Sequence, residues 1–504
     1  MEIKILTNPS TSRILTPLSL EWKKVIKGVC SYKPEGYYFI PAVRERRWDG
    51  SISLFDMRMQ SFPTGLLPRI LNLLGNSNID VFIEDESNNS QQFQNVSRET
   101  FAGVSWNTAF VPRDYQEVAA GKLLDKKRGI IKIATGGGKT LVAAIVINAL
   151  QTRTLFLVDG VDLALQTKRA LEKYLPGLEV GLIGDGVWNP KTVTVALLQT
   201  LAHGLGLVRE KLKTAGGQDV MDEAGEVIRV HKKVRQDYID FCASQRLVIY
   251  DEVHGAASSR GEGIVQYCVN AVYKHGLSAT PLERGDNANI RVEAVTGQVL
   301  MSITSSELIR AGWLAKPTIG MATYDDAGAV NKSAAWPEVR KNCVVDNAGR
   351  HALVRRAVER ELRLAGSSSA VLVSVVQIEH GHRLVNELQS LGEPVAFIKG
   401  SDPSEHREEV LENFRSGRVP ILIGSSILNK GIDLPNMTGF VLSGPWKDRI
   451  QTQQLIGRPL HVAAPTVRIT DIADLSHKYL KAQTAARLSV YREEPEYVLV
   501  KLSI

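Results

Sequence analysis

The stretch Ile133-Ala134-Thr135-Gly136-Gly137-Gly138-Lys139-Thr140 decides how this 504-residue chain folds. It follows an apolar run, Gly129–Ile133, that is typical of a buried strand, and it opens an apolar helical pattern, Leu141–Ala149. Three consecutive glycines let backbone N–H groups come close to phosphate oxygens, and the start of the following helix adds its dipole. In such a turn Lys139 can bridge the β- and γ-phosphates of a nucleotide, and the Thr140 hydroxyl can ligate Mg²⁺. The strict pattern begins with glycine where this chain has isoleucine, and the alternative is a flexible glycine-rich turn.

Two acidic residues at the end of another apolar run supply the second half of a nucleotide site. Asp251 and Glu252 come directly after Leu247–Tyr250, so we expect them at the C-terminal edge of a parallel sheet, where such sheets bind ligands. Asp251 would hold Mg²⁺, and Glu252 would orient and deprotonate the attacking water. An Asp-Glu pair in this place can instead cap a helix, but the upstream glycine-rich turn favours catalysis.

From about residue 109 onward, apolar runs alternate with helical patterns, which predicts parallel sheets with both faces covered by helices. The runs are Gly129–Ile133, Arg153–Val158, Thr192–Leu197, Leu247–Tyr250 and His275–Leu277 in a first series, and Ala370–Val375, Val395–Ile398, Pro420–Ile423, Gly439–Leu442 and Thr466–Asp471 in a second. We therefore predict two tandem α/β domains, residues 106–312 and 313–504. Residues 205–243 interrupt the first series, and two short apolar runs around an Asp-Glu-Ala-Gly turn predict a β-hairpin insertion there.

Residues 1–105 contain short apolar or alternating runs, typical of strands, separated by Gly, Pro and Asn. These runs are Glu2–Leu6, Tyr37–Ile40, Ser51–Phe55 and Asp80–Ile83. Helical patterns at Leu18–Val29 and Leu66–Leu74 complete a small α+β domain. The polar stretch Glu84–Asn95 predicts a linker or an exposed loop.

The composition limits the class of protein only loosely. A net charge of +7 is compatible with a polyanionic partner, and equally with a mildly basic soluble protein. The four cysteines form no C-x-x-C pair, which predicts buried free thiols and a reducing compartment. The N-terminus lacks the apolar region of a signal peptide, and no apolar stretch reaches 18 residues, so we expect no membrane span.

The nucleotide motifs, with several short motifs around them, resemble those of DExH-type superfamily 2 helicases. Arg113-Asp114-Tyr115-Gln116 is similar to the motif with which that family reads adenine, which implies that Arg113 and Gln116 contact the nucleotide. The resemblance also implies contacts to the nucleic-acid backbone from Gln166, Gln199 and Thr200. Ser278-Ala279-Thr280 matches the motif that couples the nucleotide site to the nucleic acid.

The second α/β domain carries the remaining helicase motifs in order. They imply nucleic-acid contacts from Ser374, Arg407 and Ser425, and nucleotide contacts from Gly431 and Asp433. The stretch Gln454–Arg458 resembles the last motif, in which Arg458 would stabilise charge on the transferred phosphoryl group. The family has a further arginine where this chain has His461. We therefore expect Arg458 to be the principal arginine finger, with the second one absent or supplied from elsewhere, for example by Arg468.

The N-terminal region is similar to that of the phage UvsW-type recombination helicases. Gly36–Pro41, Arg47-Trp48-Asp49-Gly50 and Leu54-Phe55-Asp56 carry this resemblance, which together with the motor motifs spans nearly the whole chain. Arg44, Arg46 and Arg47 can neutralise DNA phosphates, and Trp48 can stack on a base. The alternative is a solvated basic loop with Trp48 in the core of the small domain.

The resemblance implies two tandem RecA-like parallel-sheet motor domains of α/β class, preceded by a small α+β DNA-binding domain. It implies an ATP- and Mg²⁺-dependent DNA helicase that unwinds or branch-migrates forks and Holliday junctions in phage-type replication, recombination or repair. We expect a monomer in the cytoplasm, that of an infected host if the phage resemblance holds. The alternatives are an RNA helicase, the motor subunit of a nuclease complex, and a nucleic-acid clamp that does not hydrolyse ATP.

Overall fold

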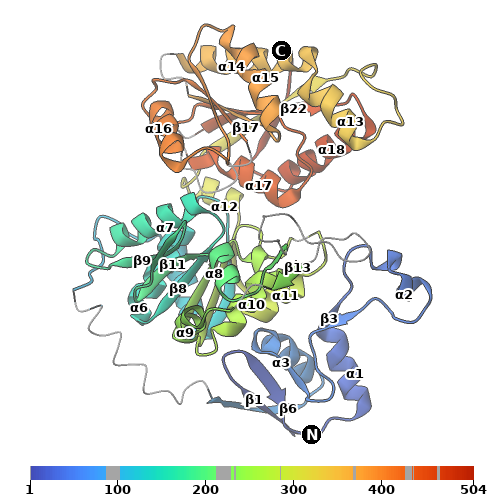
Figure 1. The fold of residues 1–504 in the computed structure, drawn as a ribbon, viewed down its shortest axis with the longest axis vertical. Helices are drawn as coiled ribbons and strands as arrows, with labels where there is room; N and C mark the ends of the chain where they lie inside the picture. The colour runs from blue at the N-terminus through green and yellow to red at the C-terminus, as the bar shows by residue number, and fades with distance from the viewer. Residues whose placement is uncertain are drawn as a thin grey trace. The chain divides into compact units, whose positions relative to one another are not determined.

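The computed structural model describes residues 2–86, 101, 103–211, 229–231, 234–283, 285–366, 370–425, 434, 436–461 and 466–504. The chain divides into two compact units. The first comprises Met1–Ile133 and Gly138–Ser302, and the second comprises Ala134–Gly137 and Ile303–Ile504. Figure 1 shows the helices and strands of both units.

The N-terminal part of the first unit is a four-stranded sheet with two helices packed on it. The sheet has the order β5-β2-β1-β6, with β1 antiparallel to β2 and parallel to β6. The elements are β1 (Glu2–Thr7), β2 (Thr11–Ile14), β5 (Ser61–Pro63), β6 (Asp80–Asp85), α1 (Leu20–Val29) and α3 (Leu67–Asn76). Ile3 and Ile5 alternate with exposed residues along β1 and pack with Ile26 of α1 and Ile70 of α3. The alternating pattern of the strand thus faces the apolar stripes of the helices in one core.

The run Tyr37–Ile40, predicted as a strand, is helical instead. Tyr37–Phe39 form a 3₁₀ turn (η1) that leads into α2 (Pro41–Arg44), between the short paired strands β3 (Ser31–Tyr32) and β4 (Ile52–Ser53). Gly36 turns the chain before the run with φ +72°, and Pro41 lies in the first turn of α2, where its missing N–H costs nothing. The glycine and the proline therefore outweigh the aromatic strand signal.

The N-terminal part docks on the first motor sheet through α11 (Asn289–Thr296). The turn η2 (Thr64–Leu66) lies so close to α11 that a Cβ on Gly65 would stand 2.1 Å from the Glu293 carbonyl oxygen. The guanidinium of Arg69 binds the Glu293 carboxylate, with Nη2 donating to Oε1 at 2.9 Å. Ala294 of α11 belongs to the apolar core of the N-terminal part. The two parts consequently share one core and one half-buried ion pair.

The motor part of the first unit is an eight-stranded sheet of order β10-β9-β11-β8-β14-β15-β7-β16. Its strands are β7 (Arg128–Ile133), β8 (Thr154–Val158), β9 (Val180–Gly184), β10 (Val187–Asn189), β11 (Val193–Leu197), β14 (Leu247–Asp251), β15 (Tyr273–Ser278) and β16 (Val299–Ile303). Its helices are α5 (Asp114–Lys126), α6 (Lys139–Leu150), α7 (Val161–Tyr174), α8 (Leu198–Gly204), α9 (Gln236–Ala243), α10 (Ser259–Tyr267) and α11. The five strands predicted in this region all form, and their registered pairs are parallel.

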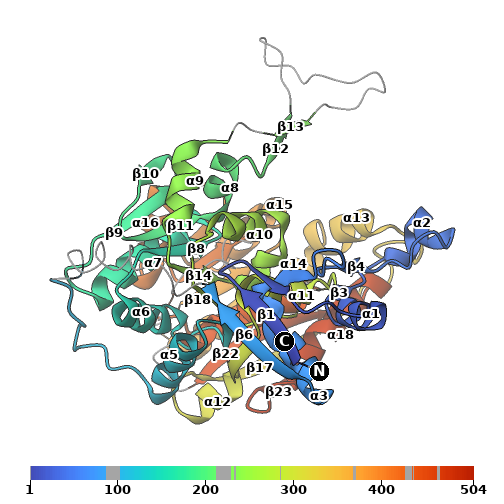
Figure 2. The same cartoon turned by 90° about the horizontal axis from the view of Figure 1, so that it is seen from below.

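Within the predicted insertion, β12 (Arg209–Lys211) pairs antiparallel with β13 (Arg229–His231), while the predicted Asp-Glu-Ala-Gly turn lies outside the described residues. Figure 2 shows these strands extending away from α8 and α9. Residues 212–228 lie outside the described residues. The last part of the predicted insertion, residues 236–243, is helix α9 and packs in the motor core through Tyr238 and Phe241.

The second unit is built on a seven-stranded sheet of order β19-β20-β18-β21-β22-β17-β23, in which every registered pair is parallel. The strands are β17 (Lys316–Tyr324), β18 (Val371–Ser374), β19 (Val395–Ile398), β20 (Ile421–Gly424), β21 (Gly439–Leu442), β22 (Thr466–Asp474) and β23 (Val498–Leu502). The helices are α12 (Ser305–Arg310), α13 (Trp336–Val339), α14 (Ala348–Ala365), α15 (Ile378–Gln389), α16 (Ser404–Arg415), α17 (Arg449–Gly457) and α18 (Lys478–Arg492). Leu372 packs in one apolar cluster, and Val371 and Val373 pack in another. Alternate residues of β18 therefore bury both faces of the sheet.

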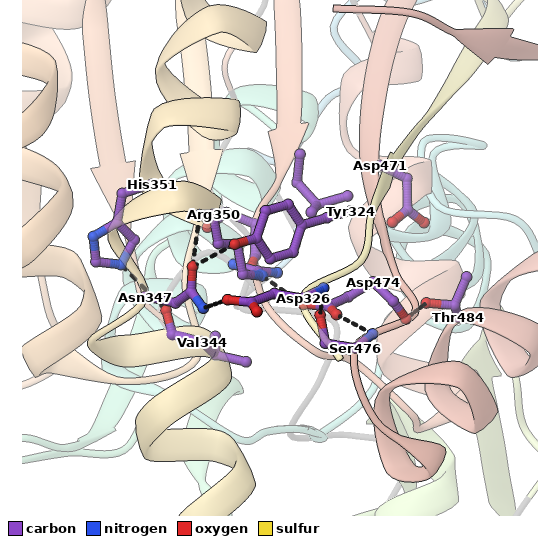
Figure 3. A network of polar contacts seen from close by, with 12 residues as sticks. Tyr324, Asp326, Val344, Asn347, Arg350, His351, Asp471, Asp474, Ser476 and Thr484 are labelled. Atoms are coloured by element: carbon purple, nitrogen blue, oxygen red, sulfur yellow. Dashed lines mark hydrogen bonds and ion pairs between the residues drawn. The ribbon is translucent and has the colours of Figure 1, made fainter. Parts of the chain in front are cut away.

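A buried polar network lies where β17 and β22 end in the second unit. Figure 3 shows Asn347 between Tyr324 and Asp326, accepting a hydrogen bond from the Tyr324 hydroxyl at 2.6 Å and donating to Asp326 at 3.0 Å. Next to them, Nε of Arg350 donates to Asp474 at 2.9 Å, and both side chains are at least 96% buried. These bonds tie the start of α14 to the ends of two strands.

The prediction about the cysteines is also met by the structure. All four cysteines are buried free thiols. In the ranges that the structure describes, no helix combines the length and the apolar character that crossing a membrane requires.

Candidate nucleotide and nucleic-acid sites

The glycine-rich turn joins β7 to α6, as the sequence predicts. Strand β7 ends at Ile133, and α6 begins at Lys139 with Gly138 as its N-cap. Gly136 and Gly138 have φ values of +89° and +78°, in the left-handed region that only glycine enters without strain. The turn therefore directs the N-terminus of α6, with its N–H groups, towards any phosphate bound in the loop.

Lys139 and Glu252 form an ion pair at the C-terminal edge of the sheet. Nζ of Lys139 lies 2.8 Å from Oε1 of Glu252, and the two side chains are 14% and 25% exposed. The Ser278 hydroxyl, at the end of β15, donates to Oε2 of the same carboxylate at 2.8 Å. Three segments that are distant in sequence thus converge on one carboxylate, and the first of them is the phosphate-binding turn.

The backbone of Glu252 adopts a conformation that side chains rarely tolerate. Its φ of +49° and ψ of +55° lie in the left-handed region, which costs a non-glycine residue roughly 1–3 kcal/mol. In this conformation the Glu252 N–H donates a hydrogen bond to Oδ1 of Asp251, with an N···O distance of 3.0 Å. Such strain gathers at functional sites, where the surrounding structure fixes one geometry.

The two acidic side chains have opposite electrostatic environments. Burial raises the pKa of Asp251 to about 6, although the charge of Lys139 opposes this shift. Burial alone would also raise the pKa of Glu252, but Lys139 and the adjacent His254 lower it below its ordinary value. Nδ1 of His254 lies 3.5 Å from Oε2 of Glu252. Glu252 is therefore a carboxylate at neutral pH, while Asp251 gains its full charge only above about pH 6.

His254 also lies at this site, although the sequence motifs predicted no role for it. Its signal was the last position of Asp251-Glu252-Val253-His254, two residues after the proposed catalytic acid. The structure brings the ring to Glu252, so His254 contributes to the charge state of the base.

Gln116 packs against the glycine-rich turn. It is 2% exposed, and a Cβ on Gly138 would stand 2.4 Å from its Nε2 atom, so glycine is required at that position. Oε1 of Gln116 accepts a hydrogen bond from the Arg113 N–H at 2.9 Å, which caps α5. The predicted adenine-reading residues are thus held beside the phosphate-binding turn by the start of a helix.

The donor set is compatible with Mg²⁺ bound together with a nucleotide. Among the described residues, no group of three or more His, Cys, Asp or Glu side chains could hold a metal ion by itself. Mg²⁺ at nucleotide sites takes one or two carboxylates and completes its shell with phosphate oxygens and water. A buried aspartate, Asp251, and a hydroxyl at the start of α6, Thr140, are donors of that kind.

The structure describes only some of the nucleotide contacts predicted in the second unit. Arg458 is half-buried and comes directly after α17. Gly431 and Asp433 lie outside the described residues. Arg468, suggested as a source of a second arginine, is the third residue of β22, and its Nε binds Glu361 at 2.7 Å, so that role stays a prediction.

The candidates for nucleic-acid contact fall into two groups. Arg44, Arg46, Arg47, Gln166 and Gln199 are exposed, and Thr200 is half-buried. Ser374, Arg407 and Ser425 are at most 9% exposed, so their side chains offer little surface to a phosphate in this structure. Trp48 is half-buried, and its Nε1 donates to the Ser51 carbonyl at 3.1 Å.

Comparisons with known proteins agree with this geometry. Residues 109–283 match the model of the type III restriction enzyme res subunit, and residues 354–462 match that of the helicase conserved C-terminal domain. The chain is 26% identical to the DNA 3'-5' translocase XPB2 of Sulfurisphaera tokodaii, over 69% of this chain and 78% of that protein. It is 21% identical to the ATP-dependent DNA helicase uvsW of Enterobacteria phage T4, over 88% of this chain and 85% of that protein.

Solved structures support the two-sheet architecture. The fragment structure of a putative HsdR subunit of a type I restriction enzyme from Vibrio vulnificus YJ016 is 19% identical with a TM-score of 0.56, covering 86% of this chain and 73% of that one. The S. cerevisiae Dbp5 structure, bound to RNA and ADP BeF3, is 15% identical with a TM-score of 0.53, covering 78% and 90%. At these identities the likeness is one of fold, that of two parallel-sheet motor domains.

Proposed function

The chain belongs to the superfamily 2 helicases and is an ATP-dependent enzyme of that class, and we propose that it moves on DNA and remodels branched DNA. The observation that carries the motor assignment is the contact of Lys139 and Ser278 with one carboxylate, that of Glu252. The phosphate-binding lysine, the water-activating acid and the coupling motif are thereby joined in one hydrogen-bonded group. A chain with a degenerate nucleotide site would have no reason to keep this group together.

In the proposed reaction, Lys139 and the N–H groups at the start of α6 bind the triphosphate. Asp251 and Thr140 would hold Mg²⁺, which neutralises charge on the β- and γ-phosphates. Glu252, ionised and fixed by Ser278, would orient the attacking water and accept its proton. Arg458 would stabilise charge on the transferred phosphoryl group, with Gly431 and Asp433 as further nucleotide contacts.

DNA rather than RNA is the proposed track because the named relatives act on DNA. The proposal of branched DNA rests on the N-terminal part. The match to the phage helicase covers 88% of the chain, more than the two proposed motor domains together, and so extends into that part. Three exposed arginines, Arg44, Arg46 and Arg47, lie there within four positions and can bind backbone phosphates.

A side-by-side assay on four substrates tests the proposed track. ATP hydrolysis and strand displacement would be measured with a forked duplex, a four-way junction, a linear duplex and an RNA duplex. We expect the two branched DNAs to give the highest rates. Equal rates on linear and branched DNA would remove the branch-remodelling claim, and stronger stimulation by RNA would identify an RNA helicase. A folded Lys139→Ala variant should lose hydrolysis yet still bind DNA.

The N-terminal arginines allow a matched test. Replacing Arg44, Arg46 and Arg47 together with alanine should weaken binding to the fork and flatten its salt dependence, because fewer phosphates are neutralised. The control replaces Lys24 and Lys27, exposed on α1 of the same domain, with alanine. If both variants lose the same fork affinity, the effect is one of net charge and the arginines form no specific contact.

A further inference from the structure

A cavity of about 430 Å³ lies where the N-terminal part meets the first motor sheet. It is lined by polar residues of the β1–β2 turn, β2 and β5 on one side and by residues of β7, α10, β15 and α11 on the other. Arg128 and Lys274 of its wall stand at the N-terminal ends of β7 and β15. The nucleotide site occupies the opposite edge, about 17 Å away along a six-residue strand. The cavity is therefore distinct from the site of ATP hydrolysis.

Two cationic side chains stand next to each other in this cavity. Lys274 and Arg128 are direct partners in the parallel register of β15 and β7, so both project from the same face of the sheet. Lys274 is only 2% exposed. Its Nζ has one hydrogen bond in the described part of the chain, to the Ser10 hydroxyl at 3.4 Å, although an ammonium group can donate three. Arg128 donates through Nη2 to the carbonyl of Pro9.

Two acidic side chains, Asp56 and Glu262, also line the cavity, and each already has partners. Oδ1 of Asp56 accepts from the N–H groups of Arg58 and Met59 at 2.7 and 2.9 Å. Glu262 is paired with Arg291, whose Nε lies 3.1 Å from Oε2. Asp85, the acid whose charge acts on Arg128, binds Nζ of Lys127 at 3.3 Å. Across the residues the structure describes, neither Lys274 nor Arg128 has a carboxylate within ion-pair distance.

This arrangement is unfavourable without a further group. Burial lowers the pKa of Lys274 well below its ordinary value, and the charge of Arg128 lowers it further. Burial likewise lowers the pKa of Arg128 to about 10, against the charge of Asp85. Docking of the N-terminal part does not require a buried positive charge, since a neutral donor in place of Lys274 could also donate a hydrogen bond to the Ser10 hydroxyl. An anion between the two cations would compensate both charges.

We propose that this cavity binds a phosphate-bearing small molecule, held between Lys274 and Arg128. A phosphate dianion matches two adjacent cations, and its remaining oxygens can accept from the hydroxyls of Ser10 and Ser61, which also line the wall. The volume lies in the range of small-molecule sites. Phe62 and Val265 line the cavity too and offer an apolar wall to an organic portion such as a nucleoside. Inorganic phosphate and a nucleoside monophosphate share the chemistry that the two cations recognise.

Calorimetric titration of the full chain tests the proposal. Saturating ADP with Mg²⁺ first fills the glycine-rich turn, and inorganic phosphate or AMP is then added at constant ionic strength. We expect one saturable site for at least one probe. Lys274→Met, which keeps the side-chain length and removes the charge, should weaken it more than tenfold, and Lys274→Arg should retain it. The matched control, Lys126→Met, changes an exposed lysine of the same unit and should bind as the wild type does.

A second readout separates binding from mere docking of the two parts. A phosphate next to Lys274 favours the charged form and raises the pKa of that side chain, so binding should be accompanied by proton uptake. The observed enthalpy should then differ between buffers of unequal ionisation enthalpy, and this difference should vanish in Lys274→Met. Absence of saturable binding of both probes to the wild type, or unchanged affinity in a folded Lys274→Met variant, would overturn the proposal. Preference for AMP over inorganic phosphate would assign the apolar wall to a nucleoside.

Discussion

Replacing Glu252 with glutamine should separate nucleotide binding from nucleotide hydrolysis. Glutamine keeps the shape of the side chain and an oxygen that can accept from the Ser278 hydroxyl. It removes the negative charge that holds Lys139 at 2.8 Å and the carboxylate that would accept a proton from water. Loss of a positioned general base lowers turnover by about 10²- to 10⁴-fold.

The same change should tighten the binding of ATP. Lys139 has to leave Glu252 in order to reach a phosphate, and a charged hydrogen bond of this kind contributes about 1.5–3 kcal/mol. Because the side chains are 14% and 25% exposed, we discount this to roughly 1–2 kcal/mol. Each 1.4 kcal/mol is a factor of ten, so the dissociation constant for ATP should fall by about 5- to 30-fold in the variant.

Fluorescent-nucleotide titration and phosphate release, measured on one preparation, check both halves of this prediction. The control is Glu179→Gln, which breaks the more exposed pair between Glu179 and Lys191 and should change neither quantity. Turnover of Glu252→Gln within about threefold of wild type would refute the assignment of the base. Weaker binding of ATP together with lost turnover would show that Lys139 needs the carboxylate for its position, which contradicts the competition argued above.

Three further predictions concern residues proposed to act on the nucleotide. Asp251→Asn should raise the free energy of unfolding by up to roughly 3 kcal/mol at pH 8 and by little at pH 4, as urea unfolding would show. The reason is that the pKa of Asp251 is about 6 in the folded state and lower in the unfolded chain, so its ionisation destabilises the fold as the pH rises between these two values. Equal increases in the free energy of unfolding at pH 4 and pH 8 would contradict this reasoning. Gly138→Ala should displace Gln116 and reduce ATPase activity at least tenfold, whereas Gly121→Ala, with open space around its Cβ in α5, should preserve activity. Arg458→Ala should reduce ATP turnover on the order of 10³-fold, and turnover within about twofold of wild type would remove its assignment as the finger.

The sequence predicts best those parts of the fold where the hydrophobic pattern and the residues with special backbone preferences indicate the same structure. The glycine-rich turn and its flanking strand and helix are found where the pattern placed them, since glycine, apolar run and helix start all specify the same geometry. Strand β17 escaped prediction because Pro317 and Gly320 interrupt its apolar residues. It forms nonetheless between β22 and β23, where neighbouring strands supply the hydrogen bonds.

The nucleotide site was less predictable in its conformation than in its composition. Nothing in the residue type of Glu252 indicates a left-handed backbone, because that conformation depends on its contacts with Asp251 and Lys139. Motif matching likewise gives the identity of a residue but not its exposure. Ser374 and Arg407 match their motifs, yet both are buried, as strand ends and helix faces that cover a sheet commonly are.

The buried charges of the second unit account for the fixed position of its strand ends. An arginine and an aspartate withdrawn from water cost several kcal/mol each, and their attraction offsets this only when further hydrogen bonds complete the pair. Arg487 meets that condition, because it binds both carboxylate oxygens of Asp471 at 2.7 and 2.8 Å while the Tyr491 hydroxyl donates to the same group. Apolar side chains could fill the same volume at lower cost, so stability alone does not explain such a pair. Directional bonds fix the relative position of β22 and α18 in a way that apolar packing does not. A motor that converts phosphate contacts into movement requires such rigid elements, since a strand end that yielded locally would absorb the displacement.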